Sequence, residues 1–168
     1  MMMTYRSYHL LLVLLVLAAL AFAVFYLEGV LYLDPCPLCL VDRGILLLLV
    51  GVSVIAWLHQ PKGVGRRVYA LLSGLIAAIG IAVSVRHIWL QGLPADQVPE
   101  CGPGLYFMLD VMPLGDVLSR VFNGSGSCAE VSWTFLGLSI PEQTLGLFVL
   151  LLLINVLAAR LPRNPNKI

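Results

Sequence analysis

The sequence predicts an all-α membrane protein, a bundle of four transmembrane helices with one long outer loop. Composition is the first reason: 60% of the 168 residues are hydrophobic and 11% are charged, whereas a soluble domain is about 25% charged. Four long apolar segments are the second reason, and an uneven placement of basic residues is the third. The net charge of +1 provides no basic surface for phosphates, so we expect no nucleic-acid partner.

The four apolar segments are long enough to cross a bilayer as helices. The first, residues 10–27, is an unbroken apolar run of 18 residues, which at ~1.5 Å per residue nearly crosses a ~30 Å hydrocarbon core. The others are expected at about 38–58, 68–90 and 144–161. Pro141 comes just before the last one, where a helix tolerates a missing N–H. All four should be helical, because lipid offers an isolated backbone segment no other hydrogen-bond partners.

The first segment also has features of a signal peptide. Arg6 precedes it, and Ala21-Phe22-Ala23 is compatible with a small-residue cleavage site. The apolar run continues to Leu27, however, so we expect a helix that is retained. The chain, 1–168, is then a single membrane domain.

Basic residues predict the orientation in the membrane. Seven of the ten Lys and Arg residues, and none of the nine Asp and Glu residues, lie before the first span, between the second and third, or at the end of the chain. The positive-inside rule therefore places both termini, 1–9 and 162–168, and the connection 59–67 in the cytoplasm. The loops 28–38 and 91–143 then face the outside. On that oxidising side, where disulfides persist, we expect Cys36, Cys39, Cys101 and Cys128.

The outer loop 91–143 is longer than a simple connector, and its content of Leu, Val, Phe and Tyr argues against disorder. Within it, Leu114, Val117, Leu118 and Val121 follow the i, i+3, i+4, i+7 pattern of an amphipathic helix. Such a helix lies either on the membrane surface or against the bundle, and the pattern does not separate the two.

The cysteine spacing favours thiol exchange over metal binding. Structural zinc sites usually have two close ligand pairs, but Cys101 and Cys128 stand 27 positions apart with no histidine nearby in the sequence, so we expect no metal. Two structural disulfides are the main alternative. A disulfide between Cys36 and Cys39 would stabilise little, because closing so short a loop removes little chain entropy, and Cys-x-x-Cys pairs are often exchange-active. For Cys101 and Cys128 a structural disulfide is equally compatible.

Two prolines predict where the second helix begins. Pro35 and Pro37 each restrict the preceding residue to an extended backbone, so the helix should begin near Leu38. Cys39 would then lie in its first turn, where free N–H groups and the helix dipole stabilise a thiolate.

Arg43 is a candidate to act together with Cys39. It follows Cys39 by four residues and shares its helix face, so its guanidinium can stabilise the thiolate or hold a polar ligand beside it. The alternatives are a snorkelling arginine at the membrane interface and an ion pair with the adjacent Asp42. Because charges at membrane depth are usually functional, we favour a role for Arg43.

Two segments resemble a known family. The segment PCPLCLVDR, 35–43, resembles the Pro-Cys-x-x-Cys motif, with arginine four residues after the second cysteine, of the bacterial disulfide-bond formation protein B family, DsbB. The segment GSCAEVSWTFLGLSIPEQ, 126–143, resembles the part of that family around its last cysteine. The resemblance extends over essentially the whole chain. One departure is Asp42, where many family members have Glu or Gln, and its role is left open.

The resemblance implies a membrane thiol:quinone oxidoreductase of the bacterial inner membrane. It further implies redox-active disulfides Cys36–Cys39 and Cys101–Cys128, a transient Cys36–Cys128 bridge, a periplasmic DsbA-like thiol oxidase as partner, and ubiquinone or menaquinone as the electron acceptor. Cys39 and Arg43 would face the quinone.

His87 is a further candidate for the implied quinone site. It lies at the outer end of the third span, between Arg86 and Trp89 in the local sequence. The alternative is an interfacial histidine near an aromatic-belt tryptophan.

Other functions agree with parts of the pattern. Quinone reductases of the vitamin K epoxide reductase type have a related four-helix design, but their loop cysteines precede the Cys-x-x-Cys pair, and here the order is reversed. A small membrane scaffold with two structural disulfides and a reductase that moves electrons outward are the remaining alternatives.

Overall fold

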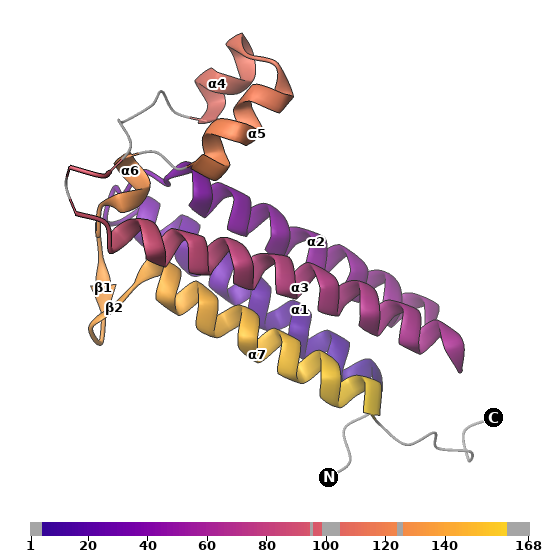
Figure 1. Cartoon of the computed structure of the whole chain (residues 1–168). Helices are drawn as coiled ribbons and strands as arrows, with labels where there is room; N and C mark the ends of the chain where they lie inside the picture. Colours follow the sequence, from indigo (N-terminus) through magenta and orange to yellow (C-terminus); the bar gives the residue numbers. More distant parts are fainter. Residues whose placement is uncertain (1–4, 95, 99–104, 124–125, 161–168) are drawn as a thin grey trace.

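Four long helices form the body of the protein in a computed structural model that describes residues 5–94, 96–98, 105–123 and 126–160 (Figure 1). Their bounds are α1 Tyr5–Ala21, continued by the π-helix η1 Phe22–Glu28, then α2 Pro37–His59, α3 Val64–Gln91 and α7 Ile140–Arg160. The segments Tyr5–Glu28, Pro37–His59, Val64–Gln91 and Ile140–Leu157 are long and apolar enough to cross a membrane. The predicted class, a helical membrane protein with four spans, is confirmed.

The helices are packed as a bundle that carries large apolar side chains both in its core and on its outside. Helix α3 packs against α2 and α7, and α1 packs against α2 and α7. Leu12, Leu49, Ala77, Phe148 and Leu151 belong to the buried core. Only 17–33% of the residues in each span are buried within the protein. The remaining apolar surface suits lipid, which is the solvent that such helices require.

Two contacts hold α3 close to α7. Gly80 of α3 lies directly against the ring of Phe148, with no space for a Cβ between them. Small residues of this kind let membrane helices approach closely. Asn155 of α7 donates a hydrogen bond from Nδ2 to the carbonyl oxygen of Ala70 in α3, at 2.8 Å, and this satisfies a polar group that lies within a span.

The shorter elements gather at one end of the bundle, opposite the start of α1 and the end of α7 (Figure 1). They are α4 Leu105–Val111, α5 Leu114–Asn123, α6 Gly126–Ala129, and the strands β1 Thr134–Phe135 and β2 Leu138–Ser139. The two strands pair antiparallel, with Thr134 opposite Ser139 and Phe135 opposite Leu138. The hairpin turn has positive φ at Leu136 and Gly137, as two-residue hairpin turns commonly require.

The amphipathic helix predicted in the outer loop is present as α5. Val117 is 3% exposed and belongs to the core cluster, whereas Leu114 is exposed. Helix α5 contacts α4 and the bundle helix α2, which supports packing against the bundle at Val117. The side chains of Leu118 and Val121 lie outside the described part of the chain, as do Cys101 and residues 161–168.

Substituting Gly80 by alanine should destabilise the bundle. The added Cβ would overlap the Phe148 ring, and overpacking of this kind costs about 1–3 kcal/mol. The measurement is the unfolding temperature in detergent. Gly51→Ala is the matched control, because nothing lies within 4 Å of a Cβ at Gly51. Equal unfolding temperatures for the two variants would show that the α3–α7 contact is looser than described.

Candidate functional site

The site is built on the first residues of α2. Cys36 is the N-cap of this helix, with φ −67° and ψ 160°, and its Sγ accepts a hydrogen bond from the N–H of Cys39 at 3.3 Å. The extended backbone expected at Cys36 is therefore confirmed. The helix begins at Pro37, one residue earlier than predicted, because proline is favoured in a first turn whose N–H groups have no helical partner.

Three cysteines meet at this cap. The Cys36 Sγ lies 2.9 Å from the Cys39 Sγ, further than the ~2.05 Å of a disulfide bond. The short helix α6 brings Cys128, which is 0% exposed, to within 4.8 Å of the Cys36 sulfur. No disulfide joins these three cysteines in the described residues, so the predicted pairing of Cys36 with Cys39 stays a prediction. The pairing of Cys101 with Cys128 lies outside those residues.

Cys36 has both other sulfurs as neighbours. The contact with Cys128, then the contact with Cys39, and then burial raise the pKa of the Cys36 thiol. Both sulfur neighbours and burial thus favour the neutral thiol of Cys36 in the reduced protein. The predicted Cys36–Cys128 bridge requires little movement from this arrangement.

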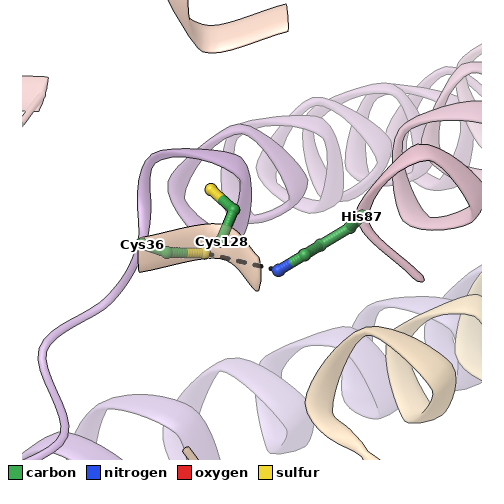
Figure 2. Close-up of side chains that lie close together, drawn as sticks. All are labelled: Cys36, His87 and Cys128. Carbon is green, nitrogen blue, oxygen red and sulfur yellow. Dashed lines mark hydrogen bonds between the residues drawn. The ribbon is translucent and has the colours of Figure 1, made fainter. Parts of the chain in front are cut away.

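His87 adds a nitrogen to the same cluster. Its Nε2 lies 3.6 Å from the Cys36 Sγ, and Figure 2 shows the two side chains pointing toward one another with Cys128 beside them. The histidine is 2% exposed, so it packs inside the protein, and its role at a quinone site stays a prediction. Trp89 is the exposed aromatic here, and the Arg86 guanidinium lies 4.3 Å from its ring centroid.

Arg43 forms an ion pair with Glu28, the last residue of η1. The suggested pair between Arg43 and Asp42 is therefore wrong. Asp42 points into the protein instead, is 3% exposed, and has no hydrogen-bond partner for its Oδ1 within the described residues. The wide turns of a π-helix are often found at functional sites, and here the π-helix ends at the residue that meets Arg43.

A pocket of about 120 Å³ joins these groups at the end of the bundle opposite the start of α1 and the end of α7 (Figure 1). It is lined from all four long helices and from the segment after α6, and Cys36, Cys39, Asp42, Arg43 and His87 are among its walls. Trp133 closes one side: its ring is 5.9 Å from that of Phe22 and stacks on that of Phe135 at 6.1 Å. The structure thus brings together four of the predicted site residues, Cys36, Cys39, Arg43 and His87, in one pocket, with Cys128 directly behind Cys36.

Comparison with known proteins agrees with this arrangement. A family model described as "Disulfide bond formation protein DsbB" matches residues 5–158. The chain belongs to the DsbB family. Among the family's curated members, disulfide bond formation protein B of Nitrosococcus oceani is 54% identical over 131 residues, covering 78% of each chain. The protein of the same name from Psychrobacter cryohalolentis is 49% identical over 156 residues, covering 92% of this chain and 88% of its own. DsbB is an oxidoreductase family, so this protein is a multi-pass membrane oxidoreductase concerned with disulfide bond formation.

Sequence reasoning missed two contacts of this DsbB-family site. The ion pair of Arg43 with Glu28 was not predicted, although Glu28 is the acidic residue that directly follows the first apolar run. The contact of His87 with Cys36 joins residues 51 positions apart. A histidine next to the outer end of a span was a signal of its presence near the site, but no spacing rule pointed to Cys36.

The closeness of Cys36 and Cys128 can be tested by cross-linking. In a Cys39→Ser, Cys101→Ser variant, mild oxidation should join Cys36 to Cys128 in most molecules, because their sulfurs lie within 4.8 Å. Peptide mapping without reduction measures the product. A Cys36→Ser, Cys101→Ser variant is the control and should cross-link more slowly, because Cys39 is not in that cluster. Equal rates in the two variants would contradict the described position of Cys36.

Proposed function

We propose that this DsbB-family protein reoxidises a periplasmic, thioredoxin-like dithiol oxidase of the DsbA type and passes the electrons to a membrane quinone. The observation that carries the proposal is the position of Cys36. Its sulfur lies 2.9 Å from that of Cys39 and within 4.8 Å of that of Cys128, at the wall of a pocket that Cys39 and Arg43 also line. One sulfur with two sulfur neighbours is what stepwise thiol–disulfide exchange requires.

The proposed orientation places the cysteine loops in the periplasm and both termini in the cytoplasm. It is supported by the asymmetry of basic residues under the positive-inside rule. It is also supported by the fold, because the cysteine cluster lies at the end of the bundle opposite the start of α1 and the end of α7 (Figure 1). A water-soluble protein partner would then meet the cysteines from outside, at the level where lipid-soluble molecules are also available.

The first exchange oxidises the partner protein. A thiolate of the partner attacks Cys101 of the Cys101–Cys128 disulfide, so that a mixed disulfide forms and Cys128 leaves as a thiolate. The second thiol of the partner then attacks the mixed disulfide, and the partner departs with its own disulfide while Cys101 leaves as a thiol. Two electrons and two protons have passed from the partner to this protein.

The second exchange takes place at the α2 cap. The Cys128 thiolate attacks the Cys36 sulfur of the Cys36–Cys39 disulfide and expels Cys39 as a thiolate, giving the Cys36–Cys128 bridge. Cys39 lies in the first turn of α2 and lines the same pocket as Arg43. The Cys101 thiolate then attacks Cys128 of this bridge, so that the Cys101–Cys128 disulfide re-forms and Cys36 leaves as a thiolate. Cys36 and Cys39 would re-form their own disulfide by giving two electrons to the acceptor, with Cys39 as the thiol that meets it.

The pocket suits a quinone head group. A bound quinone would accept two electrons from Cys39 and take up two protons. Leu20, Leu46 and Leu147 line the pocket and are compatible with an apolar ring, whereas Arg43 supplies a cation for a carbonyl oxygen. The Nδ1 of His87 is buried with no hydrogen-bond partner in the described part of the chain, which leaves it available to a bound polar group. Whether ubiquinone or menaquinone is used, the residues that hold the head group would be the same.

Replacing Cys39 by alanine should abolish quinone reduction by a reduced dithiol partner, because the last thiol of the relay is lost. Absorbance of the quinone, followed with the purified protein in detergent, measures the rate. Ser53→Ala is the control for a buried polar residue of α2 that does not line the pocket. If the unchanged protein shows no turnover, the proposed oxidase function is refuted, and a scaffold with structural disulfides is favoured. Cysteines that rest as thiols in intact cells would favour the outward-running reductase.

Arg43→Ala should raise the apparent KM for quinone about ten- to a hundred-fold, because a charge-assisted hydrogen bond contributes about 1.5–3 kcal/mol. Glu28→Gln should raise it less, since the guanidinium remains but is no longer held by its ion pair. Arg86→Ala is the matched control, because Arg86 is an outer-end arginine that does not line the pocket. An unchanged KM and an unchanged rate in Arg43→Ala would refute the role assigned to this residue.

A further inference from the structure

The cluster of Cys36, His87 and Cys128 has a composition that thiol exchange alone does not require. Two sulfurs and one imidazole nitrogen come from three separate elements, the cap of α2, helix α3 and helix α6. All three side chains are buried, and their ligand atoms lie within 4.8 Å of one another (Figure 2). The sequence argument against a metal rested on the lack of a second close cysteine pair and of a nearby histidine, and the fold brings both Cys128 and His87 to Cys36.

We propose that the reduced protein binds one thiophilic divalent cation of the zinc class at Cys36, His87 and Cys128. Two cysteines and one histidine with a fourth, open position are a known zinc ligand set. Zinc bonds of about 2.3 Å to sulfur and about 2.0–2.1 Å to nitrogen place neighbouring tetrahedral ligands about 3.5–3.8 Å apart. The 3.6 Å between Cys36 Sγ and His87 Nε2 matches this spacing.

The surroundings favour a cation. Four carboxylic side chains line the adjacent pocket, Glu28, Asp34, Asp42 and Glu130, against one guanidinium, that of Arg43. Asp34 and Glu130 are exposed, so they lie where an ion would enter. Acidic side chains at the mouth of a cleft raise the local concentration of cations. The pocket reaches Cys36 and His87 directly and so provides an entry path.

The redox state of the protein controls this site. When Cys36 is bonded to Cys39 or to Cys128, its sulfur is no longer available as a thiolate ligand. Binding to the reduced form replaces two thiol protons by one divalent cation, and no electron is transferred. The cation then holds Cys36 and Cys128 apart as thiolates and prevents the bond between them. On the proposed function, this makes zinc an inhibitor that captures the reduced enzyme.

Cobalt and zinc titrations of the reduced, quinone-free protein test the site. The background is Cys101→Ser, so that the thiols present are the three described ones. Co²⁺ should bind in one equivalent with sulfur-to-cobalt charge-transfer absorption, and Zn²⁺ should displace it. Prior oxidation of the protein should abolish binding. His87→Gln should weaken Zn²⁺ binding at least about ten-fold, since even partners of metal ligands contribute ten- to a hundred-fold.

Three further variants identify the ligands. His59→Gln is the matched control, because His59 lies at the far end of α2 beside Tyr69, and it should leave the affinity unchanged. Cys39→Ser should also retain the metal, whereas loss in Cys39→Ser with no effect of His87→Gln would overturn the proposal in favour of the Cys-x-x-Cys pair. His87→Cys should restore binding with a stronger sulfur-to-cobalt absorption, which excludes misfolding as the cause of the loss in His87→Gln.

Turnover measurements separate this inference from the proposed function. Zn²⁺ should slow quinone reduction by the unchanged protein and by His59→Gln to the same extent. Each rate is divided by the rate of the same variant without Zn²⁺, and this ratio should be closer to one in His87→Gln. If the metal-free protein has no turnover, the proposed function fails, but the Co²⁺ and Zn²⁺ titrations still decide the site. If turnover is normal and the reduced protein takes up no metal, only the metal site is overturned.

Discussion

The geometry of the site depends on where α2 begins, because Pro37 holds the chain extended at Cys36 and is itself the first residue of the helix. The N-cap is a single residue with a defined backbone conformation, so the Cys36 sulfur is positioned by the main chain. Its hydrogen bond from the N–H of Cys39 holds the two residues of the pair together. His87 from α3 and Cys128 from α6 then meet this one fixed sulfur. A change in the start of α2 would displace all these contacts at once.

Charge is a second constraint on this end of the bundle. A guanidinium close to lipid requires a partner or water. Arg43 obtains its partner, Glu28, from the end of η1. The wide turn that carries Glu28 is closed by a hydrogen bond from the N–H of Gly29 to the carbonyl oxygen of Val24, at 3.0 Å. The pair keeps Arg43 beside the pocket and prevents it from turning toward Asp42, which is buried separately. Asn155 is paired across helices with Ala70, whereas Asp42, Arg43 and His87 line the pocket.

The sequence was sufficient for what depends on local pattern. Hydropathy predicted the four spans, the two prolines predicted the extended Cys36, and the apolar periodicity of 114–121 predicted α5. It was not sufficient for contacts that join distant segments. Nothing in the local sequence relates His87 to Cys36. The π-helical turns that bring Glu28 to Arg43 have no distinctive amino-acid composition, so the run 22–28 looks like an ordinary continuation of α1. Asp42 was next to Arg43 in sequence, but neighbours along a helix point to different sides, so adjacency misled the assignment of its partner.

The two sulfur neighbours of Cys36 also limit how the proposed relay transfers electrons. A divalent sulfur can join only one other sulfur at a time, so a bond from Cys36 to Cys128 and a bond from Cys36 to Cys39 exclude each other. The thiols outside and the quinones in the bilayer would therefore never be connected through one unbroken chain of bonds. Electrons would cross two at a time and in sequence, and a second partner protein would wait until the previous pair had been delivered. One shared atom would thus impose both the stoichiometry and the order of the cycle, without any moving gate.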